Sequence, residues 1–244
     1  MTKVLVISDV HGNLTALEAV LADAGTVDEV WCLGDIAGYG PNPNECIERI
    51  RALPGLTCMM GNHDYAAIGD MPLQVFNADA KKALVWQRDI LTNTSREFLR
   101  TLFQKPKVCG DATLVHGSPR DPIWEYIMNT MMARLNLDFF TTSWCLVGHS
   151  HFQAVFQYHV ENDEMSIKVP GPAERYALKE RAILNPGSVG QPRDRDPRAA
   201  YAIFHPEPAI WEPHRVEYDI KSVQKRILDA GLPPRHAERL AGGW

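Results

Sequence analysis

The feature that most constrains the fold is a short apolar run near the start of the chain, Val4–Ile7, which leads directly into Ser8-Asp9-Val10-His11. A continuous run rich in β-branched residues is typical of a strand buried on both faces. Asp9 and His11 are two residues apart, so in an extended backbone both side chains point to the same side, just beyond the strand. The pair suits a metal, although for this fragment alone a polar loop between strand and helix is the better explanation.

The same construction recurs four more times along the first two-thirds of the chain. The further apolar runs cover 30–33, 56–60, 113–115 and 144–147, and the groups that follow them are Asp35, Asn62, His116, His149 and His151. Any one of these residues is easily explained as a polar group at a strand end or in a turn. Open sheets, however, place ligands beyond the carboxyl ends of their strands, so the whole set can converge at one site.

The number and type of these side chains predict the metal centre. Seven candidate ligands are too many for one ion that must keep an open position, and with one shared carboxylate they divide as four and four. Asp35 is the expected bridge because it stands alone after its run. Imidazole, carboxylate and amide ligands without thiolate favour Mn, Fe, Zn, Co or Ni over Ca, and four imidazoles match Mg poorly. We therefore expect two divalent transition-metal ions, Mn²⁺ first among them.

Length and charge limit the remaining possibilities. The 244 residues fit a single domain covering 1–244, and the net charge of -5 offers no basic stripe for gripping nucleic acid. No apolar stretch approaches membrane-spanning length, and the N-terminal run is too short for a signal peptide, so a cytoplasmic location is expected. The sequence does not indicate an oligomeric state.

The helical patterns form a scaffold around the candidate ligands. Expected helices cover 13–23, 42–50, two segments within 77–103, 124–137 and 220–230. Within 77–103 the second helix is expected to begin at Thr94, because Thr94 and Glu97 have the spacing of a capping box. The 124–137 helix would present an apolar face of Ile127, Met131 and Leu135, and the last helix would end at Gly231 and the Pro233-Pro234 pair. Strands of the second half, at 152–158, 165–169, 181–184 and 199–204, are expected to be mainly antiparallel.

In their order, these motifs resemble those of the calcineurin-like metallophosphoesterase superfamily. The matching stretches are Asp9-Val-His11, Gly34-Asp35, Gly61-Asn62-His63-Asp64, His116 and Gly148-His149-Ser150-His151. Two others, Gly38-Tyr-Gly-Pro41 and Asn185-Pro-Gly-Ser188, are similar to the small bacterial phosphodiesterase-like branch. The resemblance implies an α/β fold (α+β in some schemes): a four-layer α-β-β-α sandwich of two mixed sheets.

Carried over residue by residue, the resemblance also implies roles. Asp9, His11 and His151 would hold one metal, Asn62, His116 and His149 the other, with Asp35 as the bridge. His63 would be the catalytic histidine that binds no metal. Asp64 would orient its ring, or would only cap a helix. Arg120, Arg193 and Arg195 are candidates for binding the substrate, the alternative for at least two of them being a solvated loop arginine. Arg193 is preferred because it follows a Gly-rich loop.

The implied activity is that of a dinuclear-metal-dependent phosphoesterase, with a phosphodiesterase placed first, in which a hydroxide bridging the metals attacks phosphorus in line. Phosphomonoesterase and protein Ser/Thr phosphatase remain alternatives with the same chemistry. The family's protein phosphatases carry a phosphate-binding arginine after Gly-Asp, and the corresponding loop 36–40 has none. A non-catalytic binding scaffold ranks last because it needs no complete ligand set. The ligands specify a phosphoester and nothing about the rest of the substrate.

Overall fold

The computed structural model describes residues 2–169, 171 and 174–244 and contains two six-stranded sheets. In the first sheet β1 (Val4–Ile7) lies in the middle, parallel to β2 (Glu29–Cys32) and antiparallel to β11 (Ala199–His205). The other strands are β3 (Thr57–Cys58) beside β2, then β12 (Ile210–Val216) and β9 (Tyr176–Ala177) beyond β11. The sheet is therefore mixed, and the carboxyl ends of β1, β2 and β3 meet at one edge.

The second sheet is also mixed. Its order is β4 (Lys107–Cys109), β5 (Ala112–Leu114), β6 (Trp144–Leu146), β10 (Ala182–Asn185), β7 (Ala154–His159) and β8 (Glu164–Lys168). The pairs β5–β6 and β6–β10 are parallel, whereas the flanking pairs β4–β5, β10–β7 and β7–β8 are antiparallel. The expectation of mainly antiparallel strands in the second half is confirmed for β7, β8, β11 and β12.

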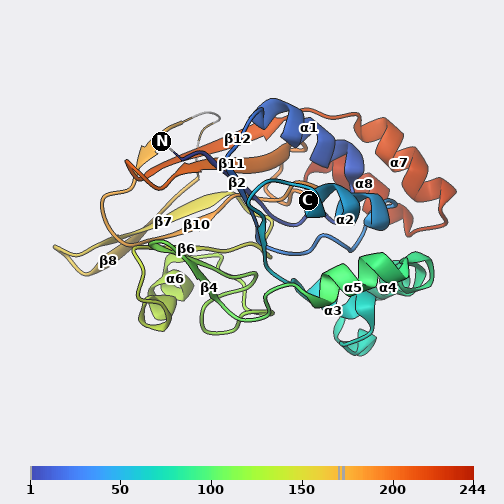
Figure 1. Ribbon diagram of the computed structural model, residues 1–244, viewed down its shortest axis with the longest axis horizontal. Helices are drawn as coiled ribbons and strands as arrows, with labels where there is room; N and C mark the ends of the chain where they lie inside the picture. The colour runs from blue at the N-terminus through green and yellow to red at the C-terminus, as the bar shows by residue number, and fades with distance from the viewer. Residues whose placement is uncertain (1, 170, 172–173) are drawn as a thin grey trace.

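The side chains of β1 show how the layers are held together. Val4 and Val6 belong to a core that also contains Leu114 and Leu146 of the second sheet, so they pack between the sheets. Leu5 and Ile7 point the other way and pack with residues of the first two helices. Because alternate residues of a strand face opposite sides, the fully apolar β1 packs against the second sheet on one face and against the helices on the other. Figure 1 shows helices outside both sheets, and the expected four-layer α-β-β-α architecture is confirmed.

The helices agree with expectation in part. They are α1 (Leu14–Ala24), α2 (Pro43–Arg51), α3 (Asn62–Ile68), α4 (Ala78–Ile90), α5 (Asn93–Arg100), α6 (Thr130–Asn136), α7 (Ile220–Asp229) and α8 (Pro234–Gly242). The second helix of 77–103 begins two residues earlier than expected, because Thr92 caps it by accepting from Ser95 N–H at 3.1 Å. The prediction of a helix over 124–137 is wrong in its first half, because only Thr130–Asn136 (α6) is helical. Met131 and Leu135 are 66% and 47% exposed, so that stripe does not face a core.

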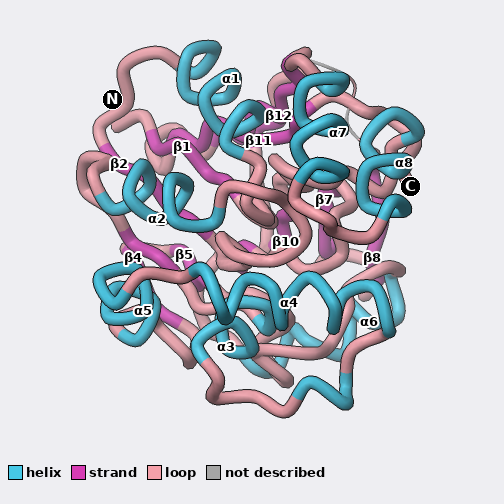
Figure 2. Tube along the Cα trace, turned by 90° about the vertical axis from the view of Figure 1, so that its right-hand side faces the viewer, coloured by secondary structure: helices cyan, strands magenta, loops and turns pink. Residues whose placement is uncertain are grey.

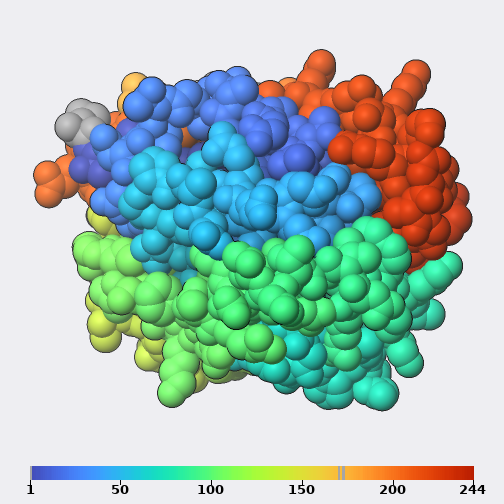
Figure 3. Space-filling view, turned by 45° about the vertical axis from the view of Figure 1, so that its right-hand side comes forward, coloured from blue at the N-terminus to red at the C-terminus, as the bar shows by residue number. Residues whose placement is uncertain are grey.

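The C-terminal segment adds a helix that the sequence patterns did not indicate. Ala237 and Leu240 of α8 pack with Val223 and Ile227 of α7 and with Ala83 of α4. Figure 2 looks onto the side where these three helices lie together, and Figure 3 shows the C-terminal helices, in red, against the teal and green segment that includes α4. Among the described residues, no helix is both long and apolar enough to cross a membrane.

Candidate metal centre

Strand ends from both sheets position the candidate ligands. Asp9 and His11 follow β1, Asp35 follows β2, Asn62 opens α3 after β3, His116 follows β5, and His149 and His151 follow β6. Main-chain hydrogen bonds join neighbouring loops: Asp9 N–H donates to Gly34 O at 3.0 Å and Gly148 N–H to His116 O at 2.8 Å. The carboxyl ends of parallel strands in two packed sheets thus meet, and side chains 140 residues apart in the chain become neighbours.

The backbone of these loops is held in an uncommon conformation. Five of the candidate ligands have positive φ angles between 48° and 62°, namely Asp9, His11, Asp35, His149 and His151. Left-handed backbone costs a non-glycine residue of the order of 1–3 kcal/mol and persists where the surrounding structure imposes it. The same unfavourable geometry at five side chains that converge indicates that their placement, and not local stability, determines these loops.

Two glycines allow the loops to approach closely. A Cβ atom at Gly61 would lie 2.0 Å from Asp35 Oδ1, and one at Gly38 would lie 2.0 Å from His11 Nδ1. Any side chain at either position would displace a candidate ligand. This explains why glycine precedes Asn62 and why the loop after Asp35 is rich in glycine.

The first cluster combines Asp9, His11 and His151. His11 Nε2 and His151 Nε2 are 3.1 Å apart, and Asp9 Oδ1 lies 3.4 Å from His151 Nε2 and 3.9 Å from His11 Nε2. All three side chains are at most 1% exposed. The three ligand atoms, which come from the two loops after β1 and β6, surround one point, which is the arrangement expected around a single ion.

The second cluster combines Asn62, His116 and His149. His116 Nε2 lies 3.2 Å from Asn62 Oδ1 and 3.2 Å from His149 Nδ1. Asp35 lies between the clusters: its Oδ2 atom is 3.7 Å from His11 Nε2 and 3.5 Å from His116 Nε2. The structure therefore brings together all seven candidate ligands in two groups with Asp35 shared, in the division that the resemblance implies.

The hydrogen-bonding pattern tests whether these residues fit a cation. His11 Nδ1 is 3.1 Å from Ala37 O and His151 Nδ1 is 2.6 Å from Gln191 O. Carbonyl oxygens only accept, so both Nδ1 atoms carry the proton, and in the neutral rings each Nε2 is a bare lone pair. Two lone pairs facing each other across 3.1 Å have no hydrogen to share. A cation bound beside them would accept both lone pairs. In addition, carbonyl partners on Nδ1 are typical of histidines that bind metal through Nε2.

The buried carboxylates support the same conclusion. Asp9 Oδ1 and Asp35 Oδ2 have no hydrogen-bond partner within the described part of the chain. Burial raises the pKa of Asp9 to about 7 and that of Asp35 well above its usual range, because desolvation disfavours the charged forms. Burial also lowers the pKa of His11 and His151 well below the usual value, which keeps both rings neutral. Both carboxylates thus have an oxygen without a hydrogen-bond donor in the described structure. The neutral histidines around them supply no positive charge to balance their negative charge.

His63 lies beside this centre without joining either group of four. Its ring packs 4.9 Å from the His11 ring, 4.6 Å from that of Tyr39 and 5.0 Å from that of Phe76, measured between centroids. A ring nitrogen of His63 lies within 4.8 Å of ligand atoms of both His11 and Asp35. Its Nδ1 atom has no hydrogen-bond partner among the described residues.

Asp64 is placed differently from the orienting role considered for it. One of its carboxylate oxygens accepts from Ala37 N–H at 2.8 Å and the other from Gly61 N–H at 3.1 Å. Both oxygens are thus used by main-chain donors, and no hydrogen bond joins Asp64 to the His63 ring. Asp64 caps α3 and fixes the loop that follows Asp35, which is the alternative that the sequence left open.

Arg193 lies at the edge of the centre and is not a solvated loop residue. Its guanidinium donates to Tyr39 Oη at 3.1 Å and to Gln191 Oε1 at 3.2 Å, while its Nε has no partner in the described structure. The pKa of Tyr39 is raised, by burial above all. Arg120, by contrast, forms an ion pair with Glu125.

Several aromatic residues around the centre were not expected from the sequence. Tyr39 is buried, and its loop is fixed by Gln87 of α4, which accepts from Gly38 N–H at 2.8 Å and donates to Gly40 O at 3.1 Å. The Tyr126 ring stacks on that of His149 at 3.9 Å with an interplanar angle of 17°. The glycines flanking Tyr39 were a usable signal for a close approach, whereas nothing in the sequence marked Tyr126.

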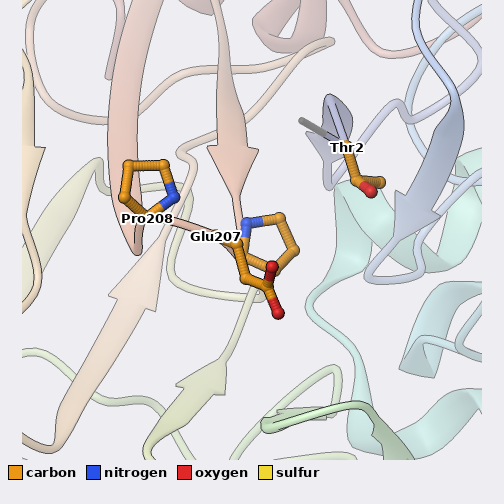
Figure 4. A pocket seen from close by; sticks show the side chains of 4 residues that line it. Thr2, Glu207 and Pro208 are labelled. Atoms are coloured by element: carbon orange, nitrogen blue, oxygen red, sulfur yellow. The ribbon is translucent and has the colours of Figure 1, made fainter.

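A separate hollow lies away from this centre. It has a volume of about 570 Å³ and is lined by Thr2, Pro206, Glu207 and Pro208 (Figure 4). Thr2 precedes β1, whereas Asp9 and His11 follow it, so the hollow lies at the opposite end of that strand. None of its lining residues is a histidine, lysine or arginine, and we assign it no part in the chemistry.

Comparison with known proteins agrees with the geometry. The sequence profile of the calcineurin-like phosphoesterase superfamily domain matches residues 2–208. A metallophosphoesterase from Sphaerobacter thermophilus has a crystal structure that superposes with a TM-score of 0.91, at 46% identity and over 100% of this chain and 99% of that one. An uncharacterized protein of Methanocaldococcus jannaschii is 38% identical over 246 residues, covering 98% of this chain and 97% of the relative.

A more local similarity concerns a known enzyme. The class 3 fructose-1,6-bisphosphatase of Lactococcus lactis is 34% identical over 99 residues, which cover 38% of this chain and 16% of that enzyme. This stretch is too short a part of that enzyme to transfer its substrate.

Proposed function

The chain belongs to the calcineurin-like phosphoesterase superfamily and is a metal-dependent phosphoester hydrolase, and on this basis we propose that it is a dinuclear phosphodiesterase. The observation that carries the proposal is the position of Asp35 Oδ2, 3.7 Å from His11 Nε2 and 3.5 Å from His116 Nε2. One carboxylate oxygen faces a histidine of each cluster, as a ligand shared by two ions would. Asp9, His11 and His151 would hold one ion, and Asn62, His116 and His149 the other.

Two divalent ions bound there would supply a nucleophile at neutral pH and positive charge for the phosphoryl oxygens. We propose Mn²⁺ as the preferred ion, because ligands rich in imidazole and free of thiolate suit such metals. Fe, Zn, Co and Ni are compatible with the same set.

Residues of the chain itself would perform the remaining steps. His63 lies beside the centre with a free Nδ1 atom, and we propose that its ring donates a proton to the leaving oxygen as the phosphorus–oxygen bond breaks. Burial lowers the pKa of His63 well below its usual value in the metal-free protein, so the ring would take up this proton only when the negatively charged substrate binds beside it. Arg193, whose Nε is free, would contact a non-bridging phosphoryl oxygen through a charge-assisted hydrogen bond.

Two alternatives share this chemistry and differ in substrate. A protein Ser/Thr phosphatase is disfavoured because the loop after Asp35 holds the buried Tyr39 and no arginine. A phosphomonoesterase is the second candidate, because the two ligand clusters are equally compatible with a phosphomonoester and specify nothing beyond the phosphoryl group.

A paired assay tests the proposal. Metal-reconstituted protein would be assayed on bis(4-nitrophenyl) phosphate and on 4-nitrophenyl phosphate, with Arg49→Gln as a matched control. Arg49 forms a surface ion pair with Glu18 and should leave both rates unchanged. We expect a higher kcat/KM for the diester. A higher value for the monoester would favour the second candidate, and no hydrolysis of either would contradict both.

A further inference from the structure

A cleft lies beside the candidate centre, between α4 and α8. Its volume is about 360 Å³, and its lining consists of Asn77, Ala78, Asp79, Arg235, His236 and Arg239. The first three residues form the start of α4 and the last three lie in the first turns of α8. Two helices therefore turn their N-terminal ends toward one space.

His236 connects this cleft to the metal ligands. Its ring packs 4.7 Å from that of Tyr39, and the Tyr39 ring in turn lies 4.5 Å from that of His11 and 4.6 Å from that of His63. His236 also lines a narrow cavity that reaches His11 and Gln191. A molecule occupying the cleft would thus be separated from the reacting groups by one aromatic ring.

The ring nitrogens of His236 are buried without hydrogen-bond partners among the described residues. The side chain is 2% exposed, yet neither ring nitrogen has a hydrogen-bond partner in the described part of the chain. The Asp79 main chain lies beside the ring, outside hydrogen-bond geometry. A buried histidine with two unused nitrogens is costly unless a ligand completes its hydrogen bonds.

Positive charge accumulates at the same place. The arginines that form ion pairs among the described residues are Arg49, Arg120, Arg134, Arg175, Arg198 and Arg215. Arg193, Arg235 and Arg239 are not in this set, and the Nε atoms of Arg193 and Arg239 are buried without a partner. Burial and the repulsion of Arg193 lower the pKa of Arg239, so the two guanidinium groups lie close enough to disfavour each other.

The N-terminal ends of the two helices add to the positive electrostatic potential of the cleft. Asn77 accepts from Ala80 N–H at 3.0 Å, while the N–H groups of Ala78 and Asp79 have no acceptor within the helix. Such free N–H groups, together with the helix dipole, attract anions. The lining contains one carboxylate, that of Asp79, and three basic side chains, those of Arg235, His236 and Arg239.

Packing alone does not require these polar residues. Ala237 and Leu240 anchor α8 in the apolar cluster shared with α4 and α7, and neither of them lines the cleft. Replacing Arg239 or His236 should therefore spare the fold.

From these observations we infer that the cleft binds a second phosphate group of the substrate, remote from the phosphoester that is cleaved. The inference rests on the proposed function for the cleaved ester and adds a substrate class: phosphodiesters that carry a further phosphate. Arg239 and His236 would donate to that phosphate, and the Ala78 and Asp79 N–H groups would complete its contacts.

Binding can be tested without catalysis. Inorganic phosphate would be titrated into the metal-free protein while ¹H–¹⁵N spectra are recorded. We expect saturable shifts at the amides of Ala78 and Asp79 and at Arg239 Nε, which disappear in Arg239→Gln and His236→Asn and persist in the surface control Arg49→Gln. Shifts confined to the loops of Asp9 and His11, or none up to tens of millimolar, would overturn the inference whether or not the protein hydrolyses phosphoesters.

The role in substrate selection needs a matched pair of substrates. Thymidine 5′-(4-nitrophenyl phosphate) and its 3′-phosphorylated form share one scissile ester and differ only in the second phosphate. We expect Arg239→Gln to raise KM for the phosphorylated form at least tenfold more than for the other, with little change in kcat. Equal effects on both substrates would overturn the inference, even if phosphate bound in the cleft, because the site would then serve a free anion.

Discussion

The main-chain N–H of His63 donates to Asp35 Oδ1 at 2.9 Å, and this bond determines which oxygen of Asp35 faces the histidines. Only Oδ2 remains free, and it lies between His11 and His116. Asp35 would thus be the ligand shared by both ions, whereas the free oxygen of Asp9 lies beside histidines of the first cluster only.

The first prediction concerns the bridge. In Asp35→Asn the side-chain oxygen can keep the bond to His63 N–H, which turns the NH₂ group toward the histidine Nε2 atoms in place of a carboxylate. Both sites should lose metal. Asp9→Asn should lose mainly the ion of the first cluster. Metal content per chain after dialysis measures the difference, and equal loss in the two variants would contradict the assignment of the bridge.

The second prediction separates catalysis from metal binding at His63. A general acid typically contributes about 10²–10⁴ in rate. His63→Ala should keep its metal and its fold but lose turnover on that scale for a diester with a poor leaving group. The loss should be clearly smaller for a nitrophenolate leaving group, which departs without a proton. Loss of metal, or equal slowing of both substrates, would exclude the general-acid role.

The third prediction follows from the titration of Asp9. Burial raises its pKa to about 7 in the metal-free protein, so below that pH a proton occupies the carboxylate and must leave before a cation binds. Apparent metal affinity should therefore rise with pH up to neutrality, by about tenfold per unit for this one proton. Calorimetric titration at pH 6, 7 and 8 measures the effect, and an affinity independent of pH would contradict it.

The same shift predicts the stability of the metal-free protein. A carboxyl group whose pKa is higher in the folded state than in the unfolded chain costs stability as pH rises from about 4 toward 7. The Tm of the metal-free protein should fall over this range, and Asp9→Asn should flatten the dependence. A Tm that responds to pH identically in both proteins would show that Asp9 does not contribute.

The ligand set could be predicted because its residues sit at strand ends. Asp9, Asp35 and His116 each follow an apolar run; Asp9 and Asp35 follow parallel strands of the first sheet, whereas His116 follows a strand of the second. Arg193 was a candidate because it follows a Gly-rich loop, and its role in binding substrate stays a prediction. The pattern thus indicates the candidate ligands one by one, whereas their meeting depends on the packing of the two sheets, which brings His11 and His151 together from positions 140 residues apart.

The cleft could not be predicted, because local signals near it are ambiguous. The Pro233-Pro234 pair is compatible with the end of α7, and proline is equally favoured at the first position of a helix such as α8. The choice depends on Ala237 and Leu240 finding Ala83 of α4, a contact across most of the chain. Likewise, Asp64 near His63 suggested an acid–base pair, and only the fold shows that main-chain donors occupy both of its oxygens.

The most direct test of the account is the number of ions needed for activity. Metal-free protein would be titrated with Mn²⁺ while bound metal and the hydrolysis of bis(4-nitrophenyl) phosphate are followed together. We expect exhaustive chelation to abolish hydrolysis, Mn²⁺ to restore it better than Mg²⁺, and both curves to saturate at about two ions per chain, as a shared Asp35 requires. Full activity after chelation, or saturation at one ion per chain, would contradict the dinuclear centre.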